Sequence, residues 1–284
     1  MTHAWEGLEV AEVRRLTAAA LTTMGCVSAA AEAELAIRRL SGADHRDRGS
    51  VLSQATLSAI DAYVEGRRRG EPPHYILGGA EFMGRWLVLD HGTYIPRPWT
   101  AEMVLRGIAI LKRVRGPRIV VDVGTGSGAI AVTIAGAVRN CHVWAVDVDP
   151  AALQCARINA ANAPGVSILQ SDLFGEMPVD LARRVDLVIG SLPYVPDSEL
   201  AHLPRDYREH EPRRALNGGP DGLALDTRAL REARGWLRAG GSLLLELGHR
   251  QGRPLAAAAT RLGYTAAIVR SDEDGDDQFL DCLL

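Results

Sequence analysis

The chain has 284 residues, of which 47% are hydrophobic and 24% charged, and its formal net charge is −3. This composition predicts a globular protein with a sizeable core, and the slight acidity gives no global field that would attract nucleic acid. We therefore expect no direct nucleic-acid binding. No apolar run approaches the roughly 20 residues of a membrane-spanning helix, and the amino-terminal residues lack the basic and apolar stretches of an export signal, so we expect no membrane association.

Residues 1–71 are predicted to form a small helical domain. Apolar side chains recur at intervals of three and four from Leu8 to about Arg69, with two interruptions by small or polar residues. This periodicity indicates three short helices. The prolines at 72 and 73 and the glycines at 78 and 79 then end the pattern, because neither pair continues a helix.

Residues 72–98 are predicted to be a linker that contains a β-hairpin. Two strand-like pieces, 80–83 and 86–89, flank Gly84 and Arg85. Two short strands around a glycine-containing pair are typical of a hairpin. An irregular segment with the sequence Y-I-P-R-P-W-T then leads into the next domain.

Residues 99–284 are predicted to form one α/β domain. Almost continuous apolar runs indicate strands at 118–123, 142–147, 166–170, 185–190 and 242–247. Helices are expected at 99–113, 127–138, 150–161, 223–237 and 251–262. Apolar strands that alternate with helices predict a parallel sheet covered on both faces. The tail is expected to close the domain with a hairpin of 266–269 and 278–283 around an acidic stretch.

The four cysteines are scattered along the chain, at Cys26, Cys141, Cys155 and Cys282. They show neither C-x-x-C spacing nor nearby histidine partners, so neither a disulfide framework nor a zinc site is expected. His210 and His249 also have no neighbours at ligand spacing. We predict a cytoplasmic protein without a bound metal.

A glycine-rich turn follows the first strand of the α/β domain. Gly124, Gly126 and Gly128 lie in the sequence D-V-G-T-G-S-G, between a strand and a helix. Glycine lets the backbone turn tightly and approach a ligand, with the N–H groups of the helix N-terminus pointing at it. Dinucleotide-binding enzymes share this geometry, but the loop lacks the G-x-G-x-x-G spacing that fits a pyrophosphate, so a nicotinamide cofactor is the weaker alternative.

Three acidic residues mark the ends of consecutive strands. Asp122 precedes the glycines, Asp147 ends the second strand, and Asp172 follows the third. A carboxylate at Asp147 is placed to accept hydrogen bonds from both hydroxyls of a ribose. The carboxylate of Asp172 is placed to accept a hydrogen bond from an adenine amino group. The alternative is that these acids are only solvated strand ends. Asp149 precedes Pro150 and is predicted to cap the next helix.

This order of glycines and acids resembles that of class I methyltransferases that use S-adenosyl-L-methionine. The candidate cofactor-binding residues are Asp122, Gly124, Thr125, Gly126, Gly128, Asp147, Val148, Asp172, Leu173 and Ser191.

Over nearly its whole length the chain resembles the glutamine-specific protein methyltransferases that modify bacterial peptide-chain release factors. Three stretches carry the resemblance, PPHYILGGAEFMGRWLVLDHGTYIPRPWT, DVGTGSGAIA and EPRRALNGGPDGL. The resemblance implies a Rossmann-like methyltransferase domain preceded by a small helical substrate-recognition domain and a connecting hairpin. It also implies S-adenosyl-L-methionine as the cofactor and a release factor or related protein as the partner.

One motif departs from the family. The family's substrate turn reads N-P-P-Y, whereas the turn after the fourth strand here consists of Ser191, Leu192, Pro193 and Tyr194. In the family, the asparagine side chain and the following carbonyl accept hydrogen bonds from the substrate amide, and the tyrosine packs beside it. The resemblance therefore implies that these four residues form the catalytic turn. Serine is shorter than asparagine, and its hydroxyl donates as well as accepts.

Three further residues are candidates for substrate contact beside Ser191 and Tyr194. Arg97 and Thr100 lie in the I-P-R-P-W-T segment, and Glu211 lies in the late loop. The alternatives are that the prolines around Arg97 only shape a connector and that Glu211 is a solvated loop charge.

We carry three hypotheses for the function. The leading one is methyl transfer from S-adenosyl-L-methionine to a glutamine side-chain amide of a release factor. A second keeps the reaction but changes the acceptor to a small molecule that bears an amide, guanidino or amino nitrogen. The altered turn, and an acidic D-E-D-G-D-D-Q-F-L tail where the family tends to have a basic residue, favour this second hypothesis. The third is a cofactor-binding protein that has lost catalysis.

Overall fold

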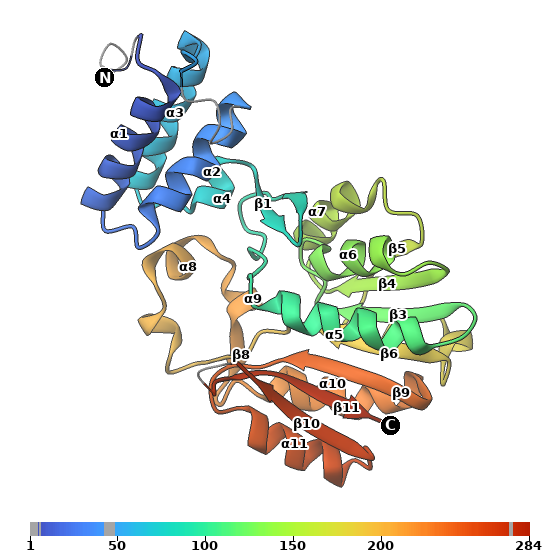
Figure 1. Ribbon diagram of the computed structural model, residues 1–284. Helices are drawn as coiled ribbons and strands as arrows, with labels where there is room; N and C mark the ends of the chain where they lie inside the picture. Colours follow the sequence, from blue (N-terminus) through green and yellow to red (C-terminus); the bar gives the residue numbers. More distant parts are fainter. Residues whose placement is uncertain (1–4, 6, 43–48, 273–274) are drawn as a thin grey trace. The chain divides into compact units, whose positions relative to one another are not determined.

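Figure 1 shows the computed structural model of the protein, which describes residue 5 and residues 7–42, 49–272 and 275–284. Two residues of the acidic tail, Glu273 and Asp274, lie outside the described residues. Within these ranges, no helix is both long enough and apolar enough to cross a membrane.

The chain folds into two units. One runs to Gly79 and also holds Arg205–His210, and the other comprises Ala80–Pro204 and Glu211–Leu284. The sequence placed boundaries at 71 and 98 instead. The first unit extends further because the side chains of Ile76 and Leu77 pack against its helical core.

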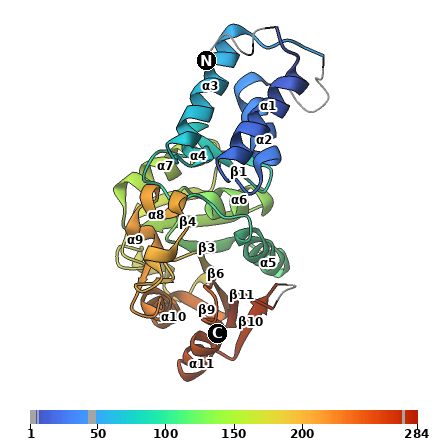
Figure 2. The same ribbon diagram turned by 90° about the vertical axis from the view of Figure 1, so that its left-hand side faces the viewer.

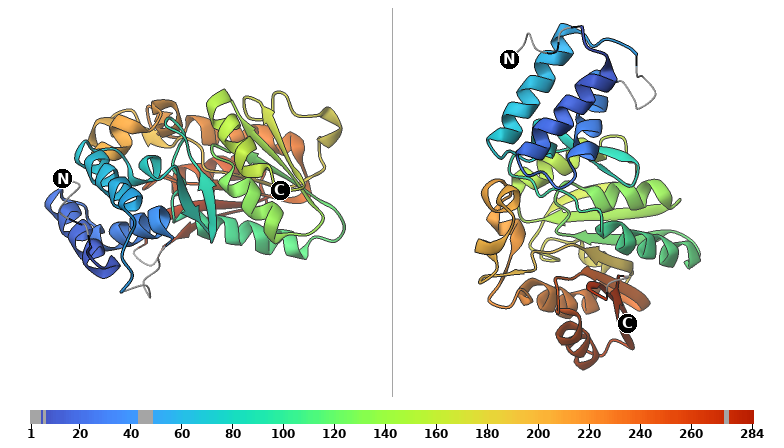
Figure 3. Two further views of the ribbon diagram at one scale, coloured as in Figure 1. Left: turned by 90° about the horizontal axis from the view of Figure 1, so that it is seen from above. Right: turned by 60° about the vertical axis from the view of Figure 1, so that its left-hand side comes forward.

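Three helices form most of the first unit, as their apolar periodicity predicts. They are α1 (Val10–Thr23), α2 (Ala29–Ser41) and α3 (Gln54–Arg68), the blue helices of Figure 3. Ser53 caps α3 by accepting a hydrogen bond from the Thr56 N–H, which satisfies one of the free donors at a helix start. A fourth short helix, α4 (Pro73–Ile76), continues the unit and was not expected after the two prolines.

A buried ion network ties α8 (Arg205–His210) to the first unit. The Arg67 guanidinium, whose side chain is 8% exposed, pairs with Glu32 at 2.7 Å and with Asp206 of α8 at 3.2 Å. The Tyr63 hydroxyl donates to the same Glu32 carboxylate. This network explains why a segment late in the sequence belongs to the amino-terminal unit, which local sequence patterns do not indicate.

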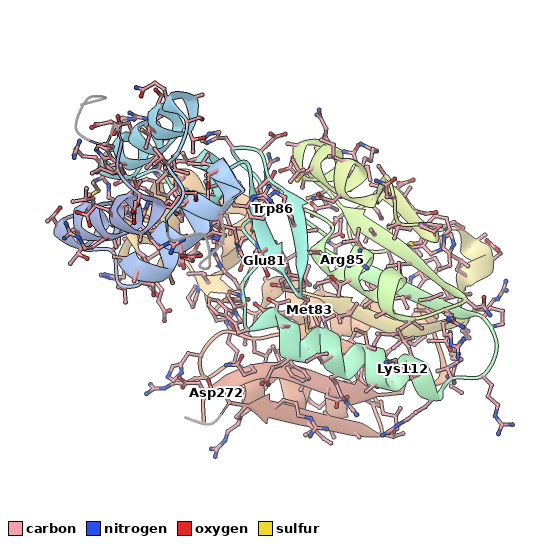
Figure 4. All side chains as sticks on the ribbon, turned by 45° about the horizontal axis from the view of Figure 1, so that its top comes forward. Glu81, Met83, Arg85, Trp86, Lys112 and Asp272 are labelled. Carbon is pink, nitrogen blue, oxygen red and sulfur yellow. The ribbon has the colours of Figure 1, made fainter. Side chains whose placement is uncertain are left out.

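The expected hairpin is present, with its turn shifted by one residue. Strands β1 (Gly79–Phe82) and β2 (Arg85–Val88) pair around Met83 and Gly84, rather than around Gly84 and Arg85. Both turn residues have positive φ, 48° and 76°, as a two-residue type I′ turn requires. Figure 4 shows Met83 at the hairpin tip.

A seven-stranded sheet forms the centre of the second unit, with the order β10-β11-β9-β6-β3-β4-β5. Neighbouring strands from β9 to β5 are parallel, as predicted, and β11 is antiparallel to both of its neighbours. The expected tail hairpin is thus confirmed as the edge of the sheet. The strands are β3 (Arg118–Val123), β4 (Cys141–Asp147), β5 (Val166–Gln170), β6 (Val185–Gly190), β9 (Leu237–Glu246), β10 (Ala266–Ser271) and β11 (Asp277–Leu283).

Helices cover both faces of this sheet. Val120 and Leu187 pack with α5 (Thr100–Arg113) and α6 (Ala129–Ala137) on one face. Val121 and Val188 pack with α10 (Ala224–Trp236) and α11 (Gly252–Arg261) on the other, and Figure 2 shows α5 and α10 on opposite sides of the strands. A further helix, α7 (Pro150–Ala160), packs beside α6 and β5.

Several short elements around and after β6 were not expected from the sequence. One, η1 (Val179–Leu181), precedes β6. The others lie between β6 and α10 and include β7 (Val195–Pro196), η2 (Leu200–His202), α9 (Arg213–Leu216) and β8 (Asn217–Gly219). Each is too short to show a periodicity. In the sheet, β4 lies on one side of β3 and β6 lies on the other, so the strand order reverses at β3. The crevice at such a reversal is where open α/β sheets bind ligands.

Candidate cofactor and acceptor site

A pocket lies at the carboxyl ends of the four adjacent strands β5, β4, β3 and β6. Four stretches contribute to its lining: 124–127 after β3, 147–149 at the end of β4, 171–173 after β5 and 191–193 after β6. The carboxyl ends of parallel strands meet at one edge of a sheet, so residues that are far apart in the sequence converge here. The pocket therefore joins the predicted cofactor loop to the predicted acceptor turn.

The glycine loop needs the freedom that glycine has. Gly124 has φ +69°, and a Cβ on it would lie 2.8 Å from Cδ2 of Leu192. Gly128 has φ +82° and begins α6, and a Cβ there would lie 3.3 Å from Ala156 of α7. The loop therefore packs closely against the acceptor turn on one side and against α7 on the other.

Asp122 lies beneath the loop and does not line the pocket. Its Oδ2 accepts hydrogen bonds from the Thr125 hydroxyl at 2.7 Å and the Ala131 N–H at 3.1 Å. Its Oδ1 has no hydrogen-bond partner among the described residues. Complete burial raises the pKa of Asp122 to about 7. The structure therefore places Asp122 as a support for the loop.

Asp147 lines the pocket with its carboxylate fixed by the main chain. One oxygen accepts from the Gly126 N–H and the other from the Asp149 N–H, each at 2.9 Å. Burial raises the pKa of Asp147, and these two N–H groups oppose the rise. Each carboxylate oxygen has a second lone pair, so two further hydrogen bonds from ribose hydroxyls are available.

The end of β5 is more exposed. The Asp172 carboxylate is 60% exposed and accepts from Arg228 of α10 at 2.8 Å, and Arg228 also pairs with Glu232. The expected hydrogen bond to an adenine amino group would therefore share this carboxylate with Arg228. Val148 lines the pocket with a half-exposed side chain, and Leu173 lines it as a buried one.

Asp149 has the structural role expected of it. Its side chain accepts from the Ala151 N–H at the start of α7. It also pairs at 2.8 Å with Arg214 of α9, a residue that lines the pocket and that the sequence did not single out.

The acceptor turn begins where β6 presses closely against β3. A Cβ on Gly190 would lie 2.4 Å from the Val123 carbonyl oxygen, so only glycine permits this approach. Ser191, Leu192 and Pro193 line the pocket.

Leu192 is 4% exposed and occupies the space that the missing Cβ of Gly124 leaves. Tyr194 does not line the pocket, and its carbonyl oxygen accepts from the Gln251 side chain at 2.8 Å. The turn therefore contacts the cofactor loop directly through one of the two residues that depart from the family pattern.

Glu246, the last residue of β9, holds the start of α5 and was missed in the sequence. It is 1% exposed and accepts hydrogen bonds from the Trp99 indole at 3.2 Å and from the Thr100 hydroxyl. A charged residue that ends an apolar strand was the available signal.

Arg97 and Glu211 are brought together as a buried ion pair outside the pocket lining. Arg97 Nη2 donates to both Glu211 oxygens, at 2.7 and 2.8 Å. The guanidinium also lies 4.6 Å from the centre of the Tyr94 ring, which does line the pocket. Burial raises the pKa of Glu211 to about 7 against the opposing effect of Arg97. The sequence suggested substrate contact for both residues, with solvent as the alternative for Glu211. In the structure Arg97 and Glu211 contact each other.

The residues present fit S-adenosyl-L-methionine. A glycine cradle with N–H groups, an acidic side chain with free lone pairs at Asp147, and apolar walls from Phe82, Ile130 and Leu173 supply the hydrogen bonds and contacts that an adenosyl group and its sulfonium need. Ser191 lines the same pocket.

Comparisons with known proteins agree with this geometry. Residues 120–210 match the family model of a methyltransferase domain. The chain is 33% identical over 286 residues to the release factor glutamine methyltransferase of Nitratidesulfovibrio vulgaris, over 99% of this chain and 92% of the relative. It is 34% identical over 241 residues to the protein of the same name from Bacillus subtilis, over 82% of each chain.

A solved methyltransferase structure from Pyrococcus furiosus aligns with a TM-score of 0.50 at 20% identity, over 71% of this chain and 89% of that one, which bears on the fold alone. The relatives in sequence go further, because they cover 99% and 82% of the chain at 33% and 34% identity. The chain belongs to the family of release factor glutamine methyltransferases.

Proposed function

We propose that the protein methylates the side-chain amide nitrogen of a glutamine in a peptide-chain release factor. The observation that carries the proposal is the position of Ser191, which directly follows β6 and lines the same pocket as the glycine loop and Asp147. The names of the family relatives supply the glutamine and the release factor. S-adenosyl-L-methionine is the cofactor, and when bound it supplies a methyl group on a positively charged sulfur.

The acceptor turn addresses the weak nucleophilicity of an amide. The nitrogen lone pair is delocalised into the carbonyl, so the reaction depends on holding the nitrogen in line with the methyl group. In this proposal the Ser191 hydroxyl and the Leu192 carbonyl accept the two amide N–H bonds, which is supported by the position of both residues in the pocket lining. Apolar walls exclude water, which favours a transfer that neutralises charge.

The remaining assignments extend this proposal. The helical unit would recognise the release factor. The residues that line the pocket belong to the other unit, so the surface of the helical unit remains for a protein partner. The protein would act in the cytoplasm, where release factors are found.

A small-molecule acceptor is the second candidate function. The observation that favours it is the departure of Ser191 and Leu192 from the family's N-P-P-Y, since these two residues line the pocket where the acceptor would lie. A shorter side chain at 191 leaves room for a differently shaped nitrogen group.

Labelled methyl transfer separates these candidates. The protein is incubated with methyl-labelled cofactor and a purified release factor, and in parallel with a small-molecule extract. The proposal predicts label on one glutamine of the release factor, and no label on a release factor in which that glutamine is replaced. Label confined to small molecules would favour the second candidate. Asp147→Ala serves as the matched control, because it removes a cofactor contact without touching the acceptor turn.

A further inference from the structure

The side chain of Gln251 binds the end of the acceptor turn. Its Nε2 donates to the Tyr194 carbonyl oxygen at 2.8 Å and, more weakly, to the Asp221 carbonyl oxygen at 3.4 Å. Its Oε1 accepts from the Gly248 N–H at 2.7 Å. Gln251 is 5% exposed, and a buried side-chain amide is costly unless its hydrogen bonds are made. Here both ends of the amide have main-chain partners.

The groups around Gln251 select an amide. A main-chain carbonyl only accepts and a main-chain N–H only donates, so the NH2 must face the two carbonyls and the oxygen must face the N–H. A carboxylate would set an oxygen against carbonyl oxygens, and an apolar side chain would make none of these hydrogen bonds. The partners come from the turn after β6, the loop between β8 and α10, and the connection from β9 to α11. Gln251 therefore joins three connections at one point.

Two glycines let the loop before α10 reach the acceptor turn. A Cβ on Gly222 would lie 2.1 Å from the Tyr194 carbonyl oxygen and 2.4 Å from Gln251 Nε2. A Cβ on Gly218 would lie 2.6 Å from the Pro193 carbonyl oxygen. These separations are too short for a side chain, and glycine is the residue that permits such close approach of two main chains. The loop therefore lies directly against the carbonyls of the turn.

The acceptor turn is thus restrained at both of its ends. At its start Gly190 presses against β3, and at its end Gln251 holds the Tyr194 carbonyl. Between these points the ring of Pro193 locks its φ at about −65°. Little freedom remains for the direction of the Leu192 carbonyl, which is one of the two acceptors proposed for the substrate amide.

We propose that Gln251 is a positioning residue for methyl transfer, which holds the Tyr194 carbonyl so that the Leu192 carbonyl points at the substrate nitrogen. The inference rests on the proposed function for the nature of the acceptor. It goes beyond that function by assigning a residue that lies outside the pocket lining, 57 positions from Tyr194 in the sequence. Gln251 acts through the turn and does not touch the substrate.

The departure of Leu192 from the family's proline makes this support more important. A proline at 192 would fix φ at that position, whereas leucine leaves it free. A turn with one more free dihedral angle depends more on the hydrogen bonds at its ends. We therefore expect the restraint by Gln251 to matter most in a chain that has leucine here.

Gln251→Met tests the proposal because it keeps the length and flexibility of the side chain and removes its donor. We expect kcat to fall on the order of 30-fold, since a small misplacement of a reacting group costs up to about 100-fold. The cofactor dissociation constant should stay within about threefold of wild type. KM for the acceptor should change less than kcat, because the substrate keeps the same partners in the pocket.

Gln251→Glu adds a readout that a structural role alone would not move. A protonated carboxyl can donate to the Tyr194 carbonyl, whereas the ionised form cannot, and burial raises the pKa of a carboxyl. The kcat of Gln251→Glu relative to that of Gln251→Met should therefore rise as the pH falls from about 8 to about 6. The ratio cancels the titration of groups that the two variants share. A ratio that is flat over this range would overturn the proposal.

The matched control removes a buried donor to a main-chain carbonyl elsewhere in the same unit. The Tyr264 hydroxyl donates to the Leu230 carbonyl oxygen at 2.9 Å, and Tyr264 is 4% exposed. Tyr264→Phe should lower the unfolding temperature as Gln251→Met does and leave kcat within about twofold of wild type. A kcat loss in Tyr264→Phe equal to that in Gln251→Met would overturn the proposal, and so would a Gln251→Met kcat within about threefold of wild type.

Thermal unfolding of each variant checks that it is folded. If Gln251→Met does not fold, Gly222→Ala perturbs the same contact with Gln251 in place, because the added Cβ would press on both the Tyr194 carbonyl oxygen and Gln251 Nε2. We expect the same loss of kcat with cofactor affinity retained. A wild-type kcat in folded Gly222→Ala would overturn the proposal.

The kinetics are measured with the acceptor that the labelling assay identifies. Label that reaches a small molecule and never a release factor would refute the proposed function, and kinetics with that small molecule would still decide the role of Gln251. A wild-type kcat in Gln251→Met with a methylated release factor would refute the role of Gln251 alone. No transfer to either pool by the wild-type protein would refute both.

Discussion

The two halves of the pocket are built from different parts of the chain. The cofactor half is mostly backbone: Gly124 and Gly126 have positive φ angles, and Asp147 is held by main-chain N–H groups. The acceptor half is mostly side chains, with Ser191, Leu192 and Thr100 in the pocket lining and the Thr100 hydroxyl donating to Glu246. A backbone cradle is fixed by glycine spacing, whereas a cluster of side chains changes with each substitution. We therefore expect substitutions in the acceptor half to change the substrate, and those in the cofactor half to change cofactor affinity.

The largest expected effect lies outside both halves, at the buried Arg97–Glu211 ion pair. Arg97→Ala would leave Glu211 buried without its partner, and breaking one side of a buried ion pair costs about 3–5 kcal/mol. Urea unfolding measures the change in the free energy of unfolding. The double variant Arg97→Met with Glu211→Leu should recover most of the loss, because no buried charge remains. A loss of less than about 1 kcal/mol for Arg97→Ala would indicate a solvated pair instead.

The next effect is a pH dependence in the cofactor half. The pKa of Asp122 is raised from 3.8 to about 7 in the folded protein, so its contribution to stability is present below pH 4 and is lost as the pH rises through 7. The free energy of unfolding should fall by roughly 3 kcal/mol more between pH 4.5 and 7.5 in the wild type than in Asp122→Asn. Parallel pH curves for the two proteins would show that Asp122 ionises at its usual pH.

Asp147→Ala should weaken cofactor binding, whereas a substitution in the acceptor half should not. The substitution removes the acceptor of the ribose hydroxyls and loosens the Gly126 and Asp149 main chain. Two hydrogen bonds to a charged group correspond to a loss of cofactor affinity of about 100-fold or more, measured by calorimetry. Ser191→Ala is the control from the other half and should leave the affinity within about threefold. Unchanged affinity in Asp147→Ala would place the ribose elsewhere.

Asp172→Asn should have a small effect. The carboxylate is 60% exposed and already engaged by Arg228, and exposed pairs contribute up to about 1 kcal/mol. We expect the cofactor dissociation constant to rise less than about fivefold in calorimetry. A loss as large as that of Asp147→Ala would show that Asp172 binds adenine with its full charge.

The same contrast explains what the sequence could predict. Strands β3, β5 and β6 begin and end where their apolar runs indicate, because strands that are buried on both faces have few polar residues. The glycine loop was recognisable because its residues are consecutive. Asp147 was predictable because its distance from the loop is set by one helix and one strand.

The acceptor half was less predictable because its partners are distant in the sequence. The Arg97–Glu211 pair spans 114 positions and the Thr100–Glu246 bond 146. Nothing local marks Glu246 as the acceptor of the Thr100 hydroxyl. The placement of α8 in the first unit was equally hidden, because Asp206 finds Arg67 only in the fold.

The most direct test of the central claim is methylation of a release factor by Ser191→Asn. An asparagine at 191 would restore the first residue of the family's N-P-P-Y and present its side-chain carbonyl to the substrate amide as a hydrogen-bond acceptor. If that half is built for a glutamine amide, the rate of label transfer should be preserved or raised relative to the wild type. A loss of more than about tenfold, with cofactor affinity unchanged, would show that the turn is built for another nitrogen group.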